Sequence, residues 1–208
     1  MNPTDIHLLL TGDELMSGDT VDSNSSMIAQ SLAAFGHGVA EKVTLGDDRA
    51  RLVAALQRAA GTARILIMNG GLGPTQDDLT AELVAAAASV ELVLHPEADK
   101  HVRDWCAARS IEPNDANLKQ AWLPEGAAII HNPRGSAVGF AMDVGGTLIL
   151  TTPACRGNSA QCCPKSVNGL LTPLAVERAT GYDCKPLASA NPPPRRDSTK
   201  TPSPGRRA

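Results

Sequence analysis

The sequence has few aromatic residues, no long apolar run and no paired-cysteine motif. Only 2% of its 208 residues are aromatic although 42% are hydrophobic, so Leu, Val, Ile and Ala must fill the core. Small side chains of this kind favour helices packed closely on a sheet over a sandwich with large interior residues. A chain of this length is long enough for one domain with a substantial core.

The other absences narrow the expected setting. No run of twenty apolar residues occurs and the N-terminus lacks the basic-then-apolar pattern of a signal peptide, so we expect a cytoplasmic protein without a membrane partner. The net charge of −3 argues against a nucleic-acid partner. The five cysteines show no C-x-x-C spacing, which argues against a zinc site, and in the cytoplasm we expect free thiols.

Short apolar runs alternate with helical patterns along the first half of the chain. The runs expected as buried strands are 6–10, 39–43 and 64–68. A helix is expected between each pair, the first capped by Asp22 or Ser23 and the second by Asp47 or Asp48. This alternation predicts an α/β fold with a mostly parallel sheet.

The second half predicts helices and then a β-hairpin. The expected helices are 79–89, 96–109 and 114–120, and the hairpin strands 137–144 and 147–152 flank Gly145-Gly146. No apolar periodicity follows, so we expect a domain at 1–152 and a largely disordered, Pro- and Arg-rich tail at 153–208.

Gly70, Gly71 and Gly73 follow the third expected strand and precede a helix. Glycines at this place let backbone N–H groups approach the phosphates of a ligand, and the helix N-terminus adds a partial positive charge. A glycine-rich turn without a ligand is the alternative. Ligands of parallel sheets bind at the carboxyl ends of strands, where Gly12, Asp13 and Glu14 also lie.

Asp77 and Asp78 follow the glycines at the start of the expected helix. Two carboxylates beside a phosphate cradle are explained by a hard divalent cation such as Mg²⁺, which binds one or two carboxylates together with substrate oxygens. In the alternative, Thr75 and Asp78 form a capping box and Asp77 stabilises the helix dipole.

Several separate motifs resemble the CinA family, part of the wider MogA, MoeA and gephyrin type of molybdopterin-binding domain. The resemblance covers residues 5 to about 152 and rests on Gly70-Gly71-Leu72-Gly73-Pro74-Thr75 followed by Asp77-Asp78-Leu79-Thr80, on Gly12-Asp13-Glu14-Leu15 with Gly18, Asp22 and Asn24 after it, on Asn117-Leu118-Lys119-Gln120-Ala121, on Pro124-Glu125-Gly126-Ala127, and on Asn132 to Phe140.

The resemblance implies a three-layer α/β/α fold of molybdopterin-domain topology, a homo-oligomer, and a metal-dependent pyrophosphatase acting on ADP-ribose-like dinucleotides. Asp78 and Asp77 would be the catalytic or metal-binding carboxylates, and the phosphorylated ligand would be bound by Gly70, Gly71, Gly73, Thr75, Gly12, Asp13, Glu14, Asn24, Lys119 and Asn132. Asp13 and Glu14 could instead cap their loop, and Lys119 could be a solvated surface residue.

Two other functions stay open: a binding module that holds a molybdopterin or nucleotide without turnover and, ranked lower, adenylyl transfer to molybdopterin. The family continues after the last strand with a Pro-Gly-Val-Pro-Gly-Glu-like motif, where this chain has Pro153-Ala154-Cys155-Arg156-Gly157-Asn158. Regrouped codons from Pro153 onward can restore the motif, so we hypothesise a shifted reading frame that leaves an aberrant tail and puts activity in question.

Overall fold

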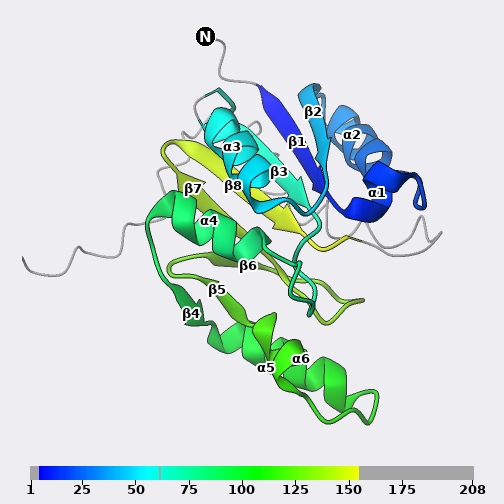
Figure 1. Cartoon of the computed structure of the whole chain (residues 1–208), viewed down its shortest axis with the longest axis vertical. Coiled ribbons are helices and arrows are strands. Elements are labelled where there is room, and N and C mark those ends of the chain that lie inside the picture. Colours follow the sequence, from blue (N-terminus) through cyan, green and yellow to red (C-terminus); the bar gives the residue numbers. More distant parts are fainter. Residues whose placement is uncertain (1–4, 61, 155–208) are drawn as a thin grey trace, which may run out of the picture.

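A computed structural model describes residues 5–60 and 62–154, which form one α/β domain (Figure 1). The strands are β1 (Ile6–Thr11), β2 (Val39–Leu45), β3 (Ile65–Asn69), β4 (Leu92–Leu94), β5 (Trp122–Pro124), β6 (Ala128–Ile130), β7 (Gly139–Val144) and β8 (Thr147–Thr152). The helices are α1 (Asp13–Ser17), α2 (Asn24–Ala34), α3 (Arg49–Ala60), α4 (Thr80–Ala88), α5 (Pro96–Ala107) and α6 (Asp115–Lys119). The proposed tail lies outside the described residues, except for Pro153 and Ala154.

Six strands form the main sheet in the order β2-β1-β3-β8-β7-β6. The first four are parallel, and β7 and β6 continue the sheet as antiparallel neighbours. Every residue of β3 is buried, as expected of a central strand covered on both faces. The two-glycine turn at Gly145-Gly146 joins β7 to β8 and confirms the predicted hairpin, whose first strand begins two residues later than expected.

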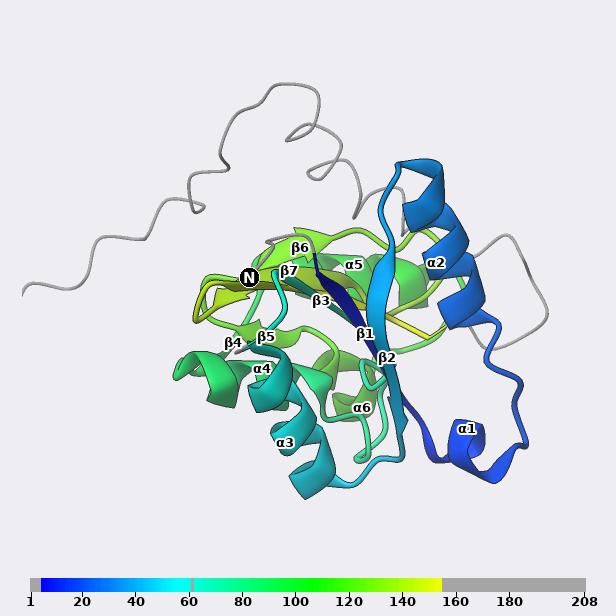
Figure 2. The same cartoon turned by 90° about the horizontal axis from the view of Figure 1, so that it is seen from above.

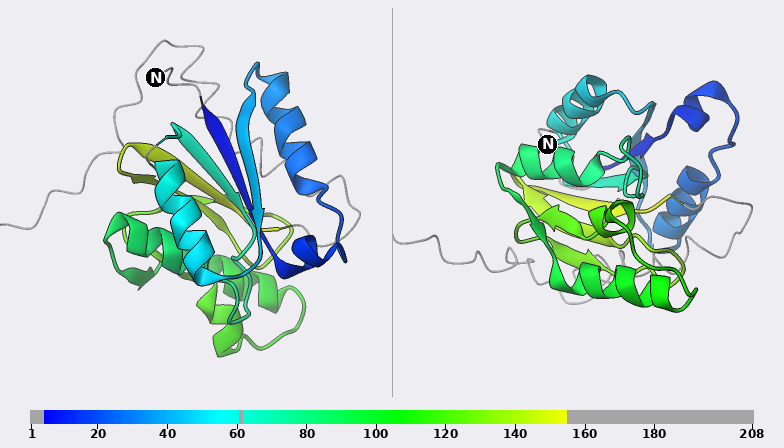
Figure 3. Two further views of the ribbon diagram at one scale, coloured as in Figure 1. Left: turned by 45° about the horizontal axis from the view of Figure 1, so that its top comes forward. Right: turned by 60° about the horizontal axis from the view of Figure 1, so that its bottom comes forward.

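Helices cover both faces of the sheet, so the three-layer architecture is confirmed (Figures 2 and 3). On one face α2 packs Ile28 and Leu32 against β1 and β3. On the other face α3, α4 and α5 enclose the larger core, which includes Phe140 and the buried free thiol of Cys106. Apart from Phe140 and Met68, the largest fully buried side chains are Leu and Ile, in agreement with the predicted aliphatic core.

Side-chain caps fix the starts of the first two long helices. Asp22 accepts a hydrogen bond from the Ser25 N–H at 2.9 Å, and Asp48 accepts one from the Arg51 N–H at 2.8 Å. Burial alone would raise the pKa of Asp22, but hydrogen bonds from Ser25 and the ammonium of Lys42 outweigh it and hold this pKa below its usual value. The sequence therefore located both helix starts correctly.

Four short elements were not predicted. Residues 11–13 were expected as a turn, but a five-residue helix, α1, begins at Asp13 and no residue of it is buried. The strands β4 and β5 pair with each other in a separate antiparallel sheet, and β6 adds the last strand to the main one. Within the described residues, no helix is both long and apolar enough to cross a membrane.

Candidate functional site

Parallel strands bring three chain segments together at one edge of the main sheet. In the strand register Asn69 lies opposite Leu10 on one side and Thr152 on the other, so the loops that follow β1, β3 and β8 leave from neighbouring points. The Gly70 N–H donates to the Thr152 carbonyl at 3.0 Å, and the Gly12 N–H donates to the Leu45 carbonyl at 3.1 Å. The candidate site is built on these strand ends.

The loop 70–79 joins β3 to α4 and needs glycine at its start. Gly70 has a φ of 111°, and a Cβ there would lie only 2.6 Å from the Thr11 carbonyl oxygen. Thr80 holds the turn: its hydroxyl donates to the Gly70 carbonyl at 2.9 Å and its N–H to the Gly71 carbonyl at 3.0 Å. Within the described residues, the N–H groups of Gly71, Leu72 and Gly73 have no hydrogen-bond partner.

Thr75 and Asp78 close a tight turn inside this loop. One carboxylate oxygen of Asp78 accepts from the Thr75 N–H at 2.8 Å and from its hydroxyl at 2.6 Å. The pair does not cap α4, whose N-cap is Leu79 without a side-chain hydrogen bond, so the capping-box alternative is wrong. Gly71 and Gly73 lie several residues before the first turn of α4, and the dipole of that helix acts mainly within that turn.

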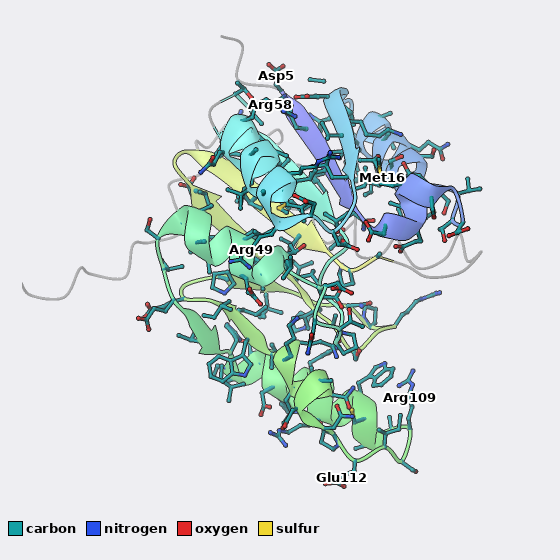
Figure 4. The ribbon with its side chains drawn as sticks, viewed as in Figure 1. Asp5, Met16, Arg49, Arg58, Arg109 and Glu112 are labelled. Atoms are coloured by element: carbon teal, nitrogen blue, oxygen red, sulfur yellow. The ribbon has the colours of Figure 1, made fainter. Side chains whose placement is uncertain are left out.

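A cleft of about 710 Å³ opens above the strand ends, large enough for a nucleotide-sized ligand. It is lined by residues 11–14, 47, 70–75, 77–78, 105, 120, 132, 135–137 and 153–154. Figure 4 shows its flanking elements, with Met16 on α1 above and Arg109 just beyond α5 below. All predicted site residues except Asn24 and Lys119 line this cleft; their roles remain predictions.

Carboxylates gather where β1 and β2 end. The Asp47 N–H donates to an Asp13 carboxylate oxygen at 3.0 Å, and the Asp13 N–H donates back to Asp47 at 3.3 Å. Partial burial raises the pKa of Asp47. The hydrogen bond from the Asp13 N–H opposes this rise, while the charges of Asp13, Glu14 and Asp77 add to it. The negative charges of Asp13, Glu14 and Asp77 thus all act on the Asp47 carboxylate.

The cleft is strongly acidic. Its described lining includes five carboxylates and no Lys, Arg or His; the acidic residues are Asp13, Glu14, Asp47, Asp77 and Asp78. Among residues 5–60 and 62–154, no three His, Cys, Asp or Glu side chains are arranged to hold a metal ion by themselves. The donors fit a hard cation that takes one or two carboxylates and completes its shell with water and ligand oxygens.

Lys119 lies on the other side of the loop 70–79. It lines a second, mainly apolar groove of about 540 Å³, which includes Leu94 and Trp122. The groove and the cleft share Leu72, Gly73, Asp78 and Gln120. The Lys119 ammonium donates to the Thr75 carbonyl at 2.6 Å and to the Asp78 carbonyl at 3.0 Å. The loop thus separates the cleft from the groove, and Lys119 holds it from the groove side instead of entering the cleft.

Asn24 and Asn132 serve different walls of this region. The Asn24 side chain donates to the amide oxygen of buried Asn69 at 3.0 Å, which ties α2 to the end of β3. Asn132 lines the cleft, and its side chain donates to the Ala137 carbonyl at 2.8 Å, which closes the loop between β6 and β7. The His101 ring contacts the Gly135 carbonyl at 2.9 Å and so connects α5 to this loop.

Asp47 and Trp105 line the cleft but were not among the predicted site residues. Asp47 could have been found, because it follows β2 as Asp13 follows β1, and both strands end at the same edge. Trp105 carried no such signal: it lies near the end of a helix and reaches the cleft only through the packing of α5.

The family model described as "Probable molybdopterin binding domain" matches residues 7–172. The chain belongs to this family. The CinA-like protein of Colwellia psychrerythraea is 52% identical over 153 residues, which is 74% of this chain and 35% of that protein. The CinA-like protein of Geobacter metallireducens is 39% identical over 171 residues, 82% of this chain and 40% of that protein. The chain therefore spans little more than a third of these relatives.

Solved structures agree with this family. A CinA protein of unknown function from Thermoplasma acidophilum has 27% identity and a TM-score of 0.70, covering 86% of this chain and 99% of its own. The molybdopterin biosynthesis enzyme MoaB from Thermus thermophilus has 20% identity and a TM-score of 0.55, covering 88% and 99%. The second likeness shows the fold alone, and both are consistent with the predicted molybdopterin-domain topology.

Proposed function

We propose that this domain binds a phosphorylated nucleotide together with a divalent cation and hydrolyses its diphosphate, with ADP-ribose-like dinucleotides as the substrate class. The supporting observation is the composition of the cleft, where five carboxylates line a site whose loop offers unpaired amide donors. Carboxylates alone would repel a diphosphate. A bound cation removes that conflict, because it neutralises phosphate charge and polarises the bonds to phosphorus.

In this proposal different residues of the site bind the phosphates, bind the cation and hold the loop 70–79 in place. The N–H groups of Gly71, Leu72 and Gly73 would bind the diphosphate oxygens. Asp77, which makes no side-chain hydrogen bond within the described residues, and the second carboxylate oxygen of Asp78 would bind the cation. Lys119 would keep the loop in place by holding the carbonyls beneath it.

The proposed reaction is a hydrolysis. The oxygen of water forms a bond to one phosphorus, the bond from that phosphorus to the bridging oxygen breaks, and the bridging oxygen leaves with the other phosphate. The proton released by water passes to a carboxylate of the cleft. With ADP-ribose the products are AMP and ribose 5-phosphate, without any change in oxidation state.

We also propose that the domain does not bind nucleic acid, forms a homo-oligomer and acts in the cytoplasm. A cleft without a described basic side chain is a poor surface for nucleic acid, whose backbone is bound mainly through Lys and Arg. Leu94 and Trp122 are 47% and 45% exposed beside the apolar groove, which fits the expectation of a homo-oligomer. A small phosphorylated molecule and a cytoplasmic location complete the proposal.

The experiment compares turnover with binding. Release of AMP from ADP-ribose is measured with Mg²⁺ and with EDTA, for the unchanged chain and for Asp77→Asn, Asp78→Asn and the control Asp104→Asn. Asn at position 78 keeps an oxygen that can accept from Thr75, so the charge is lost while the turn remains. Asp104 is an exposed residue of α5 that pairs with Lys100, so its variant removes one negative charge outside the cleft.

We expect Asp77→Asn and Asp78→Asn to lower Mg²⁺-dependent release at least about 10-fold, whereas Asp104→Asn leaves it unchanged. Binding of ADP-ribose is measured by calorimetry on the same samples. Binding of ADP-ribose without any release of AMP would refute hydrolysis and support the alternative of a non-catalytic binding module. Binding that persists in EDTA would refute the cation requirement.

A further inference from the structure

Trp105 is the one aromatic side chain among the described residues that line the cleft. It lies in the last turn of α5, half-buried against the larger core, and lines the cleft together with the carboxylates of α1. The guanidinium carbon of Arg109 lies 4.0 Å from the centre of the indole ring, and Arg109 also donates to the Trp105 carbonyl at 3.3 Å. The ring is therefore held from outside by a cation.

The indole N–H of Trp105 has no hydrogen-bond partner. Within the described residues, four buried side-chain polar atoms lack a partner, and two of them, Trp105 Nε1 and Thr11 Oγ1, belong to residues that line the cleft. An unpaired buried N–H group costs free energy unless something satisfies it. A ligand acceptor that reached this N–H would remove the cost.

We propose that Trp105 is the residue that recognises the planar, nitrogen-containing ring of the ligand, with a nucleobase as the class. The inference rests on the proposed function, in which the loop 70–79 binds the phosphates. The cleft is larger than a diphosphate needs, and Trp105 supplies what a base contacts: an aromatic surface and one donor for a ring nitrogen or oxygen. Trp105 thereby sets specificity for the ring, while the loop sets affinity for the phosphates.

The chain offers its own comparison, because it has two tryptophans. Trp122 is 45% exposed on β5, lines the apolar groove and does not line the cleft. The variant Trp122→Phe keeps Trp105 as the sole fluorescent indole, and Trp105→Phe keeps Trp122. The probes are ADP, which has a base and a diphosphate, and inorganic pyrophosphate, which has no base, both with Mg²⁺.

We expect ADP to change the emission of Trp105 and to leave that of Trp122 unaltered, because only Trp105 contacts the base. Pyrophosphate should bind without changing either emission. In calorimetry Trp105→Ala should weaken ADP binding about 5- to 100-fold, the range of a lost base–aromatic contact. The ADP affinity of Trp105→Phe should lie between that of the unchanged chain and that of Trp105→Ala. The affinity for pyrophosphate should be the same in all three proteins.

Three results would overturn the inference. An ADP-dependent change in Trp122 and not in Trp105 would place the base in the apolar groove. Equal weakening of ADP and pyrophosphate by Trp105→Phe, which retains most of the packing, would show that the ring only supports the fold. Failure of the unchanged chain to bind either probe would refute the proposed function itself, and pyrophosphate binding distinguishes that failure from the other two.

Discussion

The substitution Gly71→Ala tests whether position 71 requires glycine because of a close contact with Thr80 as well as because of its backbone conformation. A Cβ on Gly71 would overlap the hydroxyl oxygen of Thr80 and lie 3.3 Å from the Thr11 hydroxyl oxygen. Thr80 cannot move aside easily, because it is 1% exposed, branched at Cβ and bonded to the Gly70 carbonyl. The added methyl group must therefore displace the loop or break that hydrogen bond.

Gly145 is a matched control. Its φ of 61° nearly equals the 64° of Gly71, so alanine meets the same kind of backbone strain at both positions, but nothing lies within 4 Å of a Cβ on Gly145. The strain costs about 1–2 kcal/mol. Overpacking in a filled site adds about 1–3 kcal/mol. Gly145→Ala should therefore lose about 1–2 kcal/mol of unfolding free energy and Gly71→Ala about 2–5 kcal/mol.

The assay is equilibrium unfolding in urea, with the slopes compared to confirm that only stability has changed. The double variant Gly71→Ala with Thr80→Ala adds a second check. Removing the Thr80 hydroxyl relieves the overlap, so the double variant should lose at least about 1 kcal/mol less than the sum of the single losses, a coupling typical of residues in contact. Equal losses for Gly71→Ala and Gly145→Ala, or strictly additive losses in the double variant, would refute the reasoning.

The fold was predictable where local patterns are long. The buried strand 65–69 and the helices α2 and α3 follow from apolar runs and caps that lie within a few neighbouring residues. The three-residue strands β4 and β5 could not be found in this way, because each is defined only by its partner about thirty residues away. Helix α1 was missed because its five residues bury nothing and so carry no apolar period.

The site was predictable to the extent that strand ends define it. Asp13 and the loop beginning at Gly70 could be placed together because the carboxyl ends of parallel strands share an edge. The sequence could not predict the side of the loop from which Lys119 approaches, because that side depends on how α6 packs against the loop. Asp47 was interpreted as a possible helix cap, and only the structure separates it from Asp48, which does the capping.

Two further predictions concern Asp22 and Lys119. Asp22→Asn should lower the unfolding free energy by about 1 kcal/mol near neutral pH, because the charge that pairs with Lys42 at the start of α2 is lost. The folded pKa of Asp22 is depressed, so its contribution is present above the unfolded value of 3.8 and disappears as pH falls through the folded pKa. In urea titrations the difference between the variant and the unchanged chain should therefore shrink below pH 4. Lys119→Met should speed hydrogen exchange in the loop 70–79 and not in α2, because the ammonium that holds the Thr75 and Asp78 carbonyls is gone; unchanged exchange would contradict the positioning role.

The charge of the cleft limits how a phosphorylated ligand can be bound at all. Five carboxylates line it, and the partial positive charge at the start of α4, about half an elementary charge, is several residues away from Gly71. Lys119 adds one positive charge, but its donors are directed to loop carbonyls. We therefore propose that a cation offsets the repulsion, whether or not the ligand is hydrolysed. Cation-dependent binding is consequently expected of a hydrolase and of a binding module alike, and release of product is the observation that separates them.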